Sequence, residues 1–250
     1  AGQLREMASE LKIRDNPTPA TYEQVHRALL AGLIGNVGMK ALDGDHYLGL
    51  MGLLFTMHLQ RRLNELHLYS QPGLDEIIST QLRYSRSALH FKIVFHPLNS
   101  GAIEQIYEDD VLTVETIPLS HKLPCSGFLF KEKPKPRRIN KEKLTPGLLL
   151  QQIANLKKGE DIRDTEGNIL FRNEDLTFSP RKSRSYAYCS DTVFDQSFID
   201  QIRGVDLLYH EATFLEEDKL KALETKHSTA MQAATVARLA EVKSLLLGHF

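Results

Sequence analysis

Short apolar runs alternate with stretches of helical periodicity along most of the chain. Six runs are rich in β-branched and aromatic residues and predict strands at residues 90–98, 110–119, 125–130, 183–191, 205–212 and 242–250. Before and between them, apolar residues recur at helical spacing and predict helices at 46–57, 73–81, 194–203 and 228–240. This alternation predicts an α/β fold with a mixed sheet.

Two segments differ from this alternation of strand and helix patterns. Residues 1–40 are helical in pattern, with a capping-box signal at Thr21 and Gln24. Residues 131–184 carry fourteen Lys and Arg against eight Asp and Glu, a net charge of +6. Pro134 and Pro136 prevent regular strand pairing there, and a short helix and a hairpin around Gly167 follow. We expect a basic arm inserted between two core strands; the alternative is a solvated charged loop.

Composition narrows the class of protein without naming a function. The chain has 250 residues, 42% of them hydrophobic and 25% charged, with a net charge of −1. The two cysteines, Cys125 and Cys189, are far apart, so neither a disulfide framework nor a Cys-x-x-Cys zinc motif is indicated. No apolar run reaches the roughly 20 residues that span a bilayer. We expect a soluble cytoplasmic protein.

Potential metal ligands occur at the start of one predicted helix and after three predicted strands. Asp45 and His46 begin the helix in "DGDHYLGLMGLL", where Asp is also a favoured N-cap. His121, Asp191 and His249 each follow an apolar strand. Each of these three is explained separately as a solvated loop residue, but together they indicate a site at the strand ends. Carboxylates with imidazoles suit zinc or manganese better than calcium.

A second group of polar residues has the composition of an acid–base pair. His210 and Glu211 follow the strand pattern "VDLLY", and His227 precedes the last long helix. A histidine oriented by a carboxylate is a common general acid or base. The alternatives are that Glu211 is a loop acid and that His227 and Ser228 start the helix, with Ser228 as its N-cap.

Several motifs resemble those of ribonuclease Z in both content and order. They are "DGDHYLGLMGLL", "PLSHKLPCSGFLF", "YCSDT", "YHEATFLEE", "KHSTAMQAATVARLA" and "LLLGHF", and they extend from about residue 41 to residue 250. Ribonuclease Z is the tRNA 3′-processing endonuclease with the metallo-β-lactamase fold. The resemblance therefore implies an αββα sandwich, here apparently without the family's opening strands and C-terminal end, and an endoribonuclease that removes the 3′ trailer of precursor tRNA.

The resemblance also assigns roles to residues. Two zinc ions are implied, one bound by Asp45, His46, Asp191 and His249, the other by His121 and Asp191, with Asp191 bridging them. Asp45 is implied to help activate the attacking hydroxide, His227 to be the general acid for the leaving oxygen, and Glu211 to orient His227. The implied chemistry is two-metal phosphodiester hydrolysis.

The chain departs from the family pattern at the first metal site. Ala41 and Asp43 stand where the family has two histidines. Ala41 cannot bind a metal, whereas Asp43 offers a substitute oxygen ligand that favours a harder ion such as manganese. A single bound metal and a catalytically impaired tRNA-binding remnant are therefore open alternatives. A third alternative is a hydrolase of the same fold that acts on small esters or thioesters.

The family resemblance extends to the basic arm. In ribonuclease Z an insertion at this place grips tRNA, and family members commonly form homodimers. The residues implied to contact phosphates of precursor tRNA are Lys135, Arg137, Arg138, Lys141, Lys143, Lys157 and Lys158. Residues 1–40 weakly resemble part of the C-terminal region of a DEAH-box RNA helicase. This indicates a junction at Lys40–Ala41, unless the segment is a lineage-specific helical extension.

Overall fold

The computed structural model describes residues 44–144 and 147–250, with side chains from residue 49 onward. The expectations for residues 1–40, the junction at Lys40–Ala41 and the position of Asp43 lie outside these ranges. Two compact units are present in the described part of the chain. Glu108–Thr113 and Lys131–Ser185 form the second unit, and the other described residues belong to the first.

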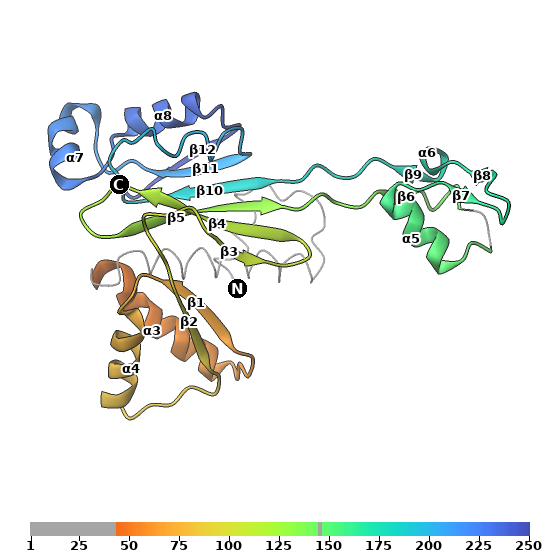
Figure 1. Cartoon of the computed structure of the whole chain (residues 1–250). Helices are drawn as coiled ribbons and strands as arrows, with labels where there is room; N and C mark the ends of the chain where they lie inside the picture. Colours follow the sequence, from red (N-terminus) through yellow and green to blue (C-terminus); the bar gives the residue numbers. More distant parts are fainter. Residues whose placement is uncertain (1–43, 145–146) are drawn as a thin grey trace. The chain divides into compact units, whose positions relative to one another are not determined.

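The largest sheet has six strands in the order β12-β11-β10-β5-β4-β3, and most of its residues belong to the first unit (Figure 1). Its strands are β3 (Gln105–Glu108), β4 (Leu112–Leu119), β5 (Cys125–Glu132), β10 (Ser185–Cys189), β11 (Leu207–Glu211) and β12 (Leu245–Gly248). Five of the six strands predicted from sequence are found in this sheet. β3 lacks the alternation of a half-buried strand and was not predicted from sequence.

Three parallel strands at one end of the sheet share a register. β11 pairs with β10 through Cys189↔His210, and with β12 through Glu211↔Gly248. The carboxyl ends of these strands therefore lie at one edge of the sheet. Residues that follow them are brought together there, as in other open α/β sheets.

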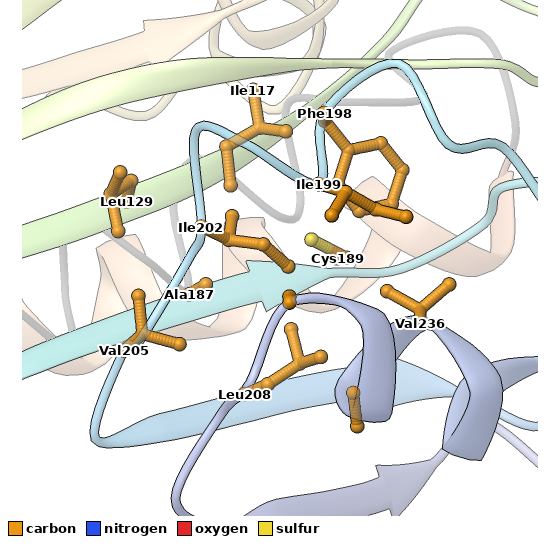
Figure 2. Packing of buried hydrophobic residues seen from close by; sticks show 12 residues of the cluster. Ile117, Leu129, Ala187, Cys189, Phe198, Ile199, Ile202, Val205, Leu208 and Val236 are labelled. Atoms are coloured by element: carbon orange, nitrogen blue, oxygen red, sulfur yellow. The ribbon is translucent and has the colours of Figure 1, made fainter.

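Helices and turns cover the same strands and form the main hydrophobic core (Figure 2). The elements after β11 are η1 (Glu216–Asp218), α7 (Lys219–Thr225) and α8 (Ala230–Leu239). Val236 of α8 and Leu208 of β11 are completely buried in this core, as is Ile202. Alternate residues of β10 and β11 contribute to it, because successive side chains of a strand point to opposite faces.

The helix predicted for residues 194–203 is wrong. This segment is a series of turns, in which Ile199, Gln201 and Arg203 donate backbone hydrogen bonds to carbonyls three residues earlier. Phe198 and Ile202 are buried in the core nonetheless (Figure 2). Their helix-like spacing thus reflects the burial of one side of the segment and not continuous i to i−4 bonding.

A smaller element group of the first unit has its own core. It comprises α3 (Gly44–Leu59), β1 (Leu66–Ser70), α4 (Leu74–Tyr84) and β2 (Ile93–Pro97). β1 and β2 pair in parallel, and Leu54, Leu68 and Leu74 are completely buried among these elements. The predicted helices at 46–57 and 73–81 correspond to α3 and α4, and the strand predicted at 90–98 is β2.

The second unit contains short elements around a small core. They are β6 (Arg138–Ile139), α5 (Leu150–Lys158), β7 (Ile162–Arg163), β8 (Ile169–Phe171), α6 (Asn173–Leu176) and β9 (Thr177–Phe178). Leu156, Ile162 and Leu176 are buried together. The antiparallel pair β7–β8 encloses Gly167, whose φ of 91° favours glycine. Across the described ranges, none of the helices has the length and apolarity needed to cross a membrane.

Candidate metal centre

Polar side chains gather where the three parallel strands end. Glu211 is the last residue of β11, Asp191 lies two residues after β10, and His249 directly follows β12. Asp191 and His249 have left-handed backbone conformations, with φ of 60° and 57°. Such values are uncommon outside glycine, although Asp and His adopt them more readily than most residues. The chain thus adopts a left-handed conformation shortly after β10 and directly after β12.

Asp191 and His249 have the spacing of two ligands of one ion. Asp191 is completely buried, and its Oδ1 lies 3.2 Å from Nε2 of His249. Zinc bonds of about 2.0–2.2 Å in a tetrahedral set put two ligand atoms about 3.3–3.5 Å apart. With His227, these residues form a group of three potential ligands whose donor atoms lie within 4.8 Å of one another. The donor chemistry and the spacing both fit zinc.

Glu211 is completely buried and accepts four hydrogen bonds at this centre. Its Oε1 accepts from the Thr192 amide at 2.7 Å and from Nδ1 of His227 at 2.9 Å. Its Oε2 accepts from the Thr213 hydroxyl at 2.7 Å and from the Ser228 amide at 3.0 Å. A carboxylate offers about four lone-pair sites, so Glu211 has no remaining acceptor capacity for a metal.

The hydrogen bonds also determine the charge of Glu211. Burial by itself would raise the pKa of this carboxyl group. The hydrogen bonds from His227, the Ser228 amide and Thr213 outweigh that effect and hold the pKa below its ordinary value. Glu211 is therefore an ionised acceptor that orients the groups around it.

Two more histidines face this centre with one ring nitrogen already engaged. Nδ1 of His227 is bound to Glu211, and Nδ1 of His121 lies 2.8 Å from the carbonyl oxygen of Lys226. Because a carbonyl oxygen only accepts, His121 carries its proton on Nδ1. The His121 and His227 ring centroids are 5.0 Å apart. In both rings a protein acceptor therefore engages Nδ1, an arrangement that orients the opposite nitrogen of metal-site histidines.

The segment before α8 holds His227 against Glu211. Lys226 has a φ of 63°, and this left-handed turn carries its carbonyl to His121. Thr229, not Ser228, is the N-cap of α8, because its side chain accepts from the Gln232 amide. The alternative role of Ser228 as the cap is wrong. The Ser228 hydroxyl instead donates to the carbonyl of Thr192 at 2.7 Å, and the Ser228 backbone amide donates to Glu211.

The structure places the other residues expected at the site as follows. Asp45 and His46 belong to the first turn of α3, and their side chains lie outside the description. His210 is buried in β11 with its Nδ1 2.8 Å from the carbonyl oxygen of Glu211, and burial lowers its pKa. It faces the hydrophobic core with its strand neighbour Cys189, away from the polar centre.

The basic residues expected to bind tRNA fall into two groups. The side chains of three of them have partners within the second unit. Lys135 pairs with Glu132 at 2.6 Å, Arg137 donates to Thr177 at 2.7 Å, and Arg138 donates to the carbonyl of Ser179 at 3.2 Å. Within the predicted set, the exposed lysines that make no ion pair with a described carboxylate are Lys141, Lys143, Lys157 and Lys158. These four are the available cations of the set.

Four residues of this centre were not predicted from the sequence: Thr192, Thr213, Lys226 and Gly248. For Thr213 a signal existed, because it lies two residues after Glu211 and period-2 alternation puts both on one side of an extended segment. Gly248 admits the close approach of Tyr209, whose hydroxyl an added Cβ would strike. The roles of Lys226 and Thr192 depend on backbone atoms, for which residue type carries no signal.

Comparison with known proteins identifies relatives of the same family as the motifs. No family model matches the chain. A ribonuclease Z of Cytophaga hutchinsonii is 49% identical over 207 residues, which are 83% of this chain and 66% of that protein. A ribonuclease Z of Bacteroides fragilis is 41% identical over 218 residues, 87% of this chain and 71% of that protein. The chain thus spans 66% and 71% of the lengths of these relatives.

Solved structures agree at the level of the fold. The short form of human tRNase Z superposes with a TM-score of 0.57 at 24% identity, over 84% of this chain and 69% of that one. A long-form RNase Z from yeast gives a TM-score of 0.51 at 14% identity, over 84% of this chain and 27% of that one. Both similarities cover 84% of this chain and show the fold alone.

Proposed function

Because the chain belongs to the ribonuclease Z family, metal-dependent endoribonucleases of the metallo-β-lactamase fold, we propose that it removes the 3′ trailer of precursor tRNA with zinc as its cofactor. The observation that carries this proposal is the 2.9 Å contact between Glu211 and His227 beside the Asp191–His249 pair. One centre thereby combines ligands suited to zinc with an oriented imidazole suited to proton transfer.

In this proposal each described side chain has a separate task. Asp191, His249 and His121 hold the metal, together with Asp45 and His46 from α3. Zinc, when bound, polarises the phosphate and activates the attacking water. His227 supplies the proton that the leaving oxygen needs. Glu211, held ionised and saturated with hydrogen bonds, keeps the His227 ring in place and stabilises its protonated form.

The proposed function is tested by identifying the cleavage product of precursor tRNA and not by the cleavage rate alone. A precursor tRNA with a labelled 3′ trailer is incubated with the zinc-loaded chain and with the same chain after removal of metal by a chelator. We expect one cut at the 3′ end of the mature tRNA, lost without metal and restored by zinc. A chain that loads zinc and binds tRNA without cutting it would instead be a tRNA-binding remnant.

We further propose that the second unit binds the phosphates of precursor tRNA through its available lysines. Lys157 and Lys158 occupy the last turn of α5, and both are exposed. Backbone contacts of this kind supply affinity without sequence specificity. An arm of this type suits a substrate that is recognised by shape, as double-stranded RNA is.

Replacing Lys157 and Lys158 together with alanine is expected to weaken precursor-tRNA binding about tenfold and leave kcat at saturation unchanged. Two lost phosphate contacts should also make the slope of log affinity against log salt shallower by about 1.5. Binding is measured by filter retention at several salt concentrations. The matched control is Lys92→Ala with Lys243→Ala, two exposed lysines of the first unit paired with Glu65 and Asp206. Equal weakening by both pairs would count against the assignment.

A further inference from the structure

The hydroxyl of Thr213 connects the carboxylate of Glu211 to the ring of His249. Thr213 Oγ1 lies 2.7 Å from Glu211 Oε2 and 2.9 Å from His249 Nδ1. It also lies 2.9 Å from the carbonyl oxygen of His249. The other ring nitrogen of His249, Nε2, faces Asp191 at 3.2 Å. Thr213 thus contacts the side of the ring opposite the candidate metal position.

Counting protons determines which nitrogen of His249 carries hydrogen. A threonine hydroxyl has one proton and two lone pairs. Glu211 Oε2 is an ionised acceptor at the shortest of the three distances, and charge-assisted bonds are about twice as strong as neutral ones. With its proton given to Glu211, the hydroxyl can only accept from His249, so Nδ1 carries the hydrogen. Donation to the His249 carbonyl oxygen would lead to the same tautomer.

This tautomer leaves a lone pair on Nε2, directed towards Asp191. A histidine must present a neutral, unprotonated nitrogen to bind zinc. Without the Thr213 hydroxyl, a proton on Nε2 would be favoured, because that nitrogen lies beside the Asp191 carboxylate at 3.2 Å. Zinc would then have to displace that proton before it could bind.

We propose that Thr213 is a positioning residue through which Glu211 orients His249 for zinc. This inference rests on the proposed function and extends it. One buried carboxylate orients two histidine rings, that of His227 for proton transfer and that of His249 for zinc binding. Its Oε1 holds His227 directly, and its Oε2 holds His249 through Thr213. Zinc affinity and proton transfer therefore share a dependence on Glu211.

The experiment uses the full chain with Thr213→Val, Thr213→Ser and a control, Thr235→Val, at a half-buried threonine of α8 whose hydroxyl donates to the carbonyl of Met231. Zinc affinity is measured by competition with a chromophoric chelator, without RNA. Loss of a partner that orients a metal ligand costs about 10–100-fold in affinity. We expect Thr213→Val to lose about tenfold, Thr213→Ser to restore it to within about threefold, and Thr235→Val to match the parent chain.

Two further measurements separate positioning from a merely structural role. The absorption bands of the cobalt-loaded chain should shift in Thr213→Val and return in Thr213→Ser, since they report the ligand geometry. KM for precursor tRNA should not change in either variant. In the Glu211→Gln background, Thr213→Val should cost less than about threefold in zinc affinity, because the two residues act through one connection.

The outcomes distinguish this inference from the function on which it rests. If the parent chain bound no zinc, the proposed function would fail first. If the parent bound zinc and Thr213→Val bound it equally well, the inference alone would be overturned. It would also be overturned if Thr213→Ser lost as much affinity as Thr213→Val, because the hydroxyl would then not be the group that matters. Thermal unfolding of both variants identifies any loss caused by misfolding.

Discussion

Replacing His227 with alanine is expected to lower kcat for precursor-tRNA cleavage about a thousandfold while bound zinc stays at the parent level. A positioned general acid contributes about 10²–10⁴-fold to the rate. The His227 ring has one nitrogen committed to Glu211 at 2.9 Å, and only 14% of its side chain is exposed. Single-turnover cleavage at saturating enzyme measures the chemical step, and elemental analysis of the same sample measures zinc.

The matched control for this variant is His67→Ala, which removes an exposed histidine of β1. Added imidazole should restore part of the activity of His227→Ala, because a soluble ring can occupy the space and deliver the proton. Loss of zinc together with activity would give His227 a different role. It would then be a third ligand beside Asp191 and His249, with which its donor atoms lie within 4.8 Å.

Replacing Asp191 with asparagine is expected to weaken zinc binding by more than about a hundredfold and to reduce cleavage to background. The change keeps the shape of a completely buried side chain but removes the charge that faces Nε2 of His249 at 3.2 Å. Loss of a ligand should exceed the roughly 10–100-fold effect of losing a residue that only orients one. Competition with a chromophoric chelator provides the affinity.

Asp200→Asn is the matched control for the loss of a carboxylate, because this aspartate is exposed and pairs only at the surface with Arg203. We expect it to leave zinc affinity and cleavage unchanged, since exposed ion pairs contribute about 0–1 kcal/mol to stability. An Asp191→Asn chain that still loaded zinc at parent affinity would contradict the ligand role of Asp191. The metal would then have to be held by other groups.

Both effects depend on an arrangement that the sequence reveals only in part. The strand patterns near Cys189, His210 and Leu247 were strong enough to predict three strands, and the polar residues after them were recognised as candidates. Parallel pairing of those strands could not be read from the patterns, because alternation reports burial and not the neighbour of a strand. The register Glu211↔Gly248 brings the strand ends to one edge.

The helix predicted at residues 194–203 shows that a hydrophobic pattern does not determine the backbone conformation either. Phe198, Ile199 and Ile202 have helical spacing, yet the segment forms turns. Their burial satisfies the hydrophobic pattern without the regular backbone that the pattern normally accompanies. The hydrophobic periodicity correctly predicted which side chains are buried in the core, but the backbone conformation that it predicted was wrong.

The sequence by itself determined the α/β class, most strands of the main sheet, the basic composition of residues 131–184 and, through ordered motifs, the ribonuclease Z family. These features are encoded locally, in the period of burial and in short runs of specific residues. Only the tertiary structure decided that Glu211 is a saturated acceptor, that the carbonyl of Lys226 orients His121, and that Thr213 reaches His249. The physical reason is that these contacts join residues distant in the chain, such as Thr213 and His249, 36 positions apart. Such contacts depend on strand order and on left-handed turns, which no local pattern specifies.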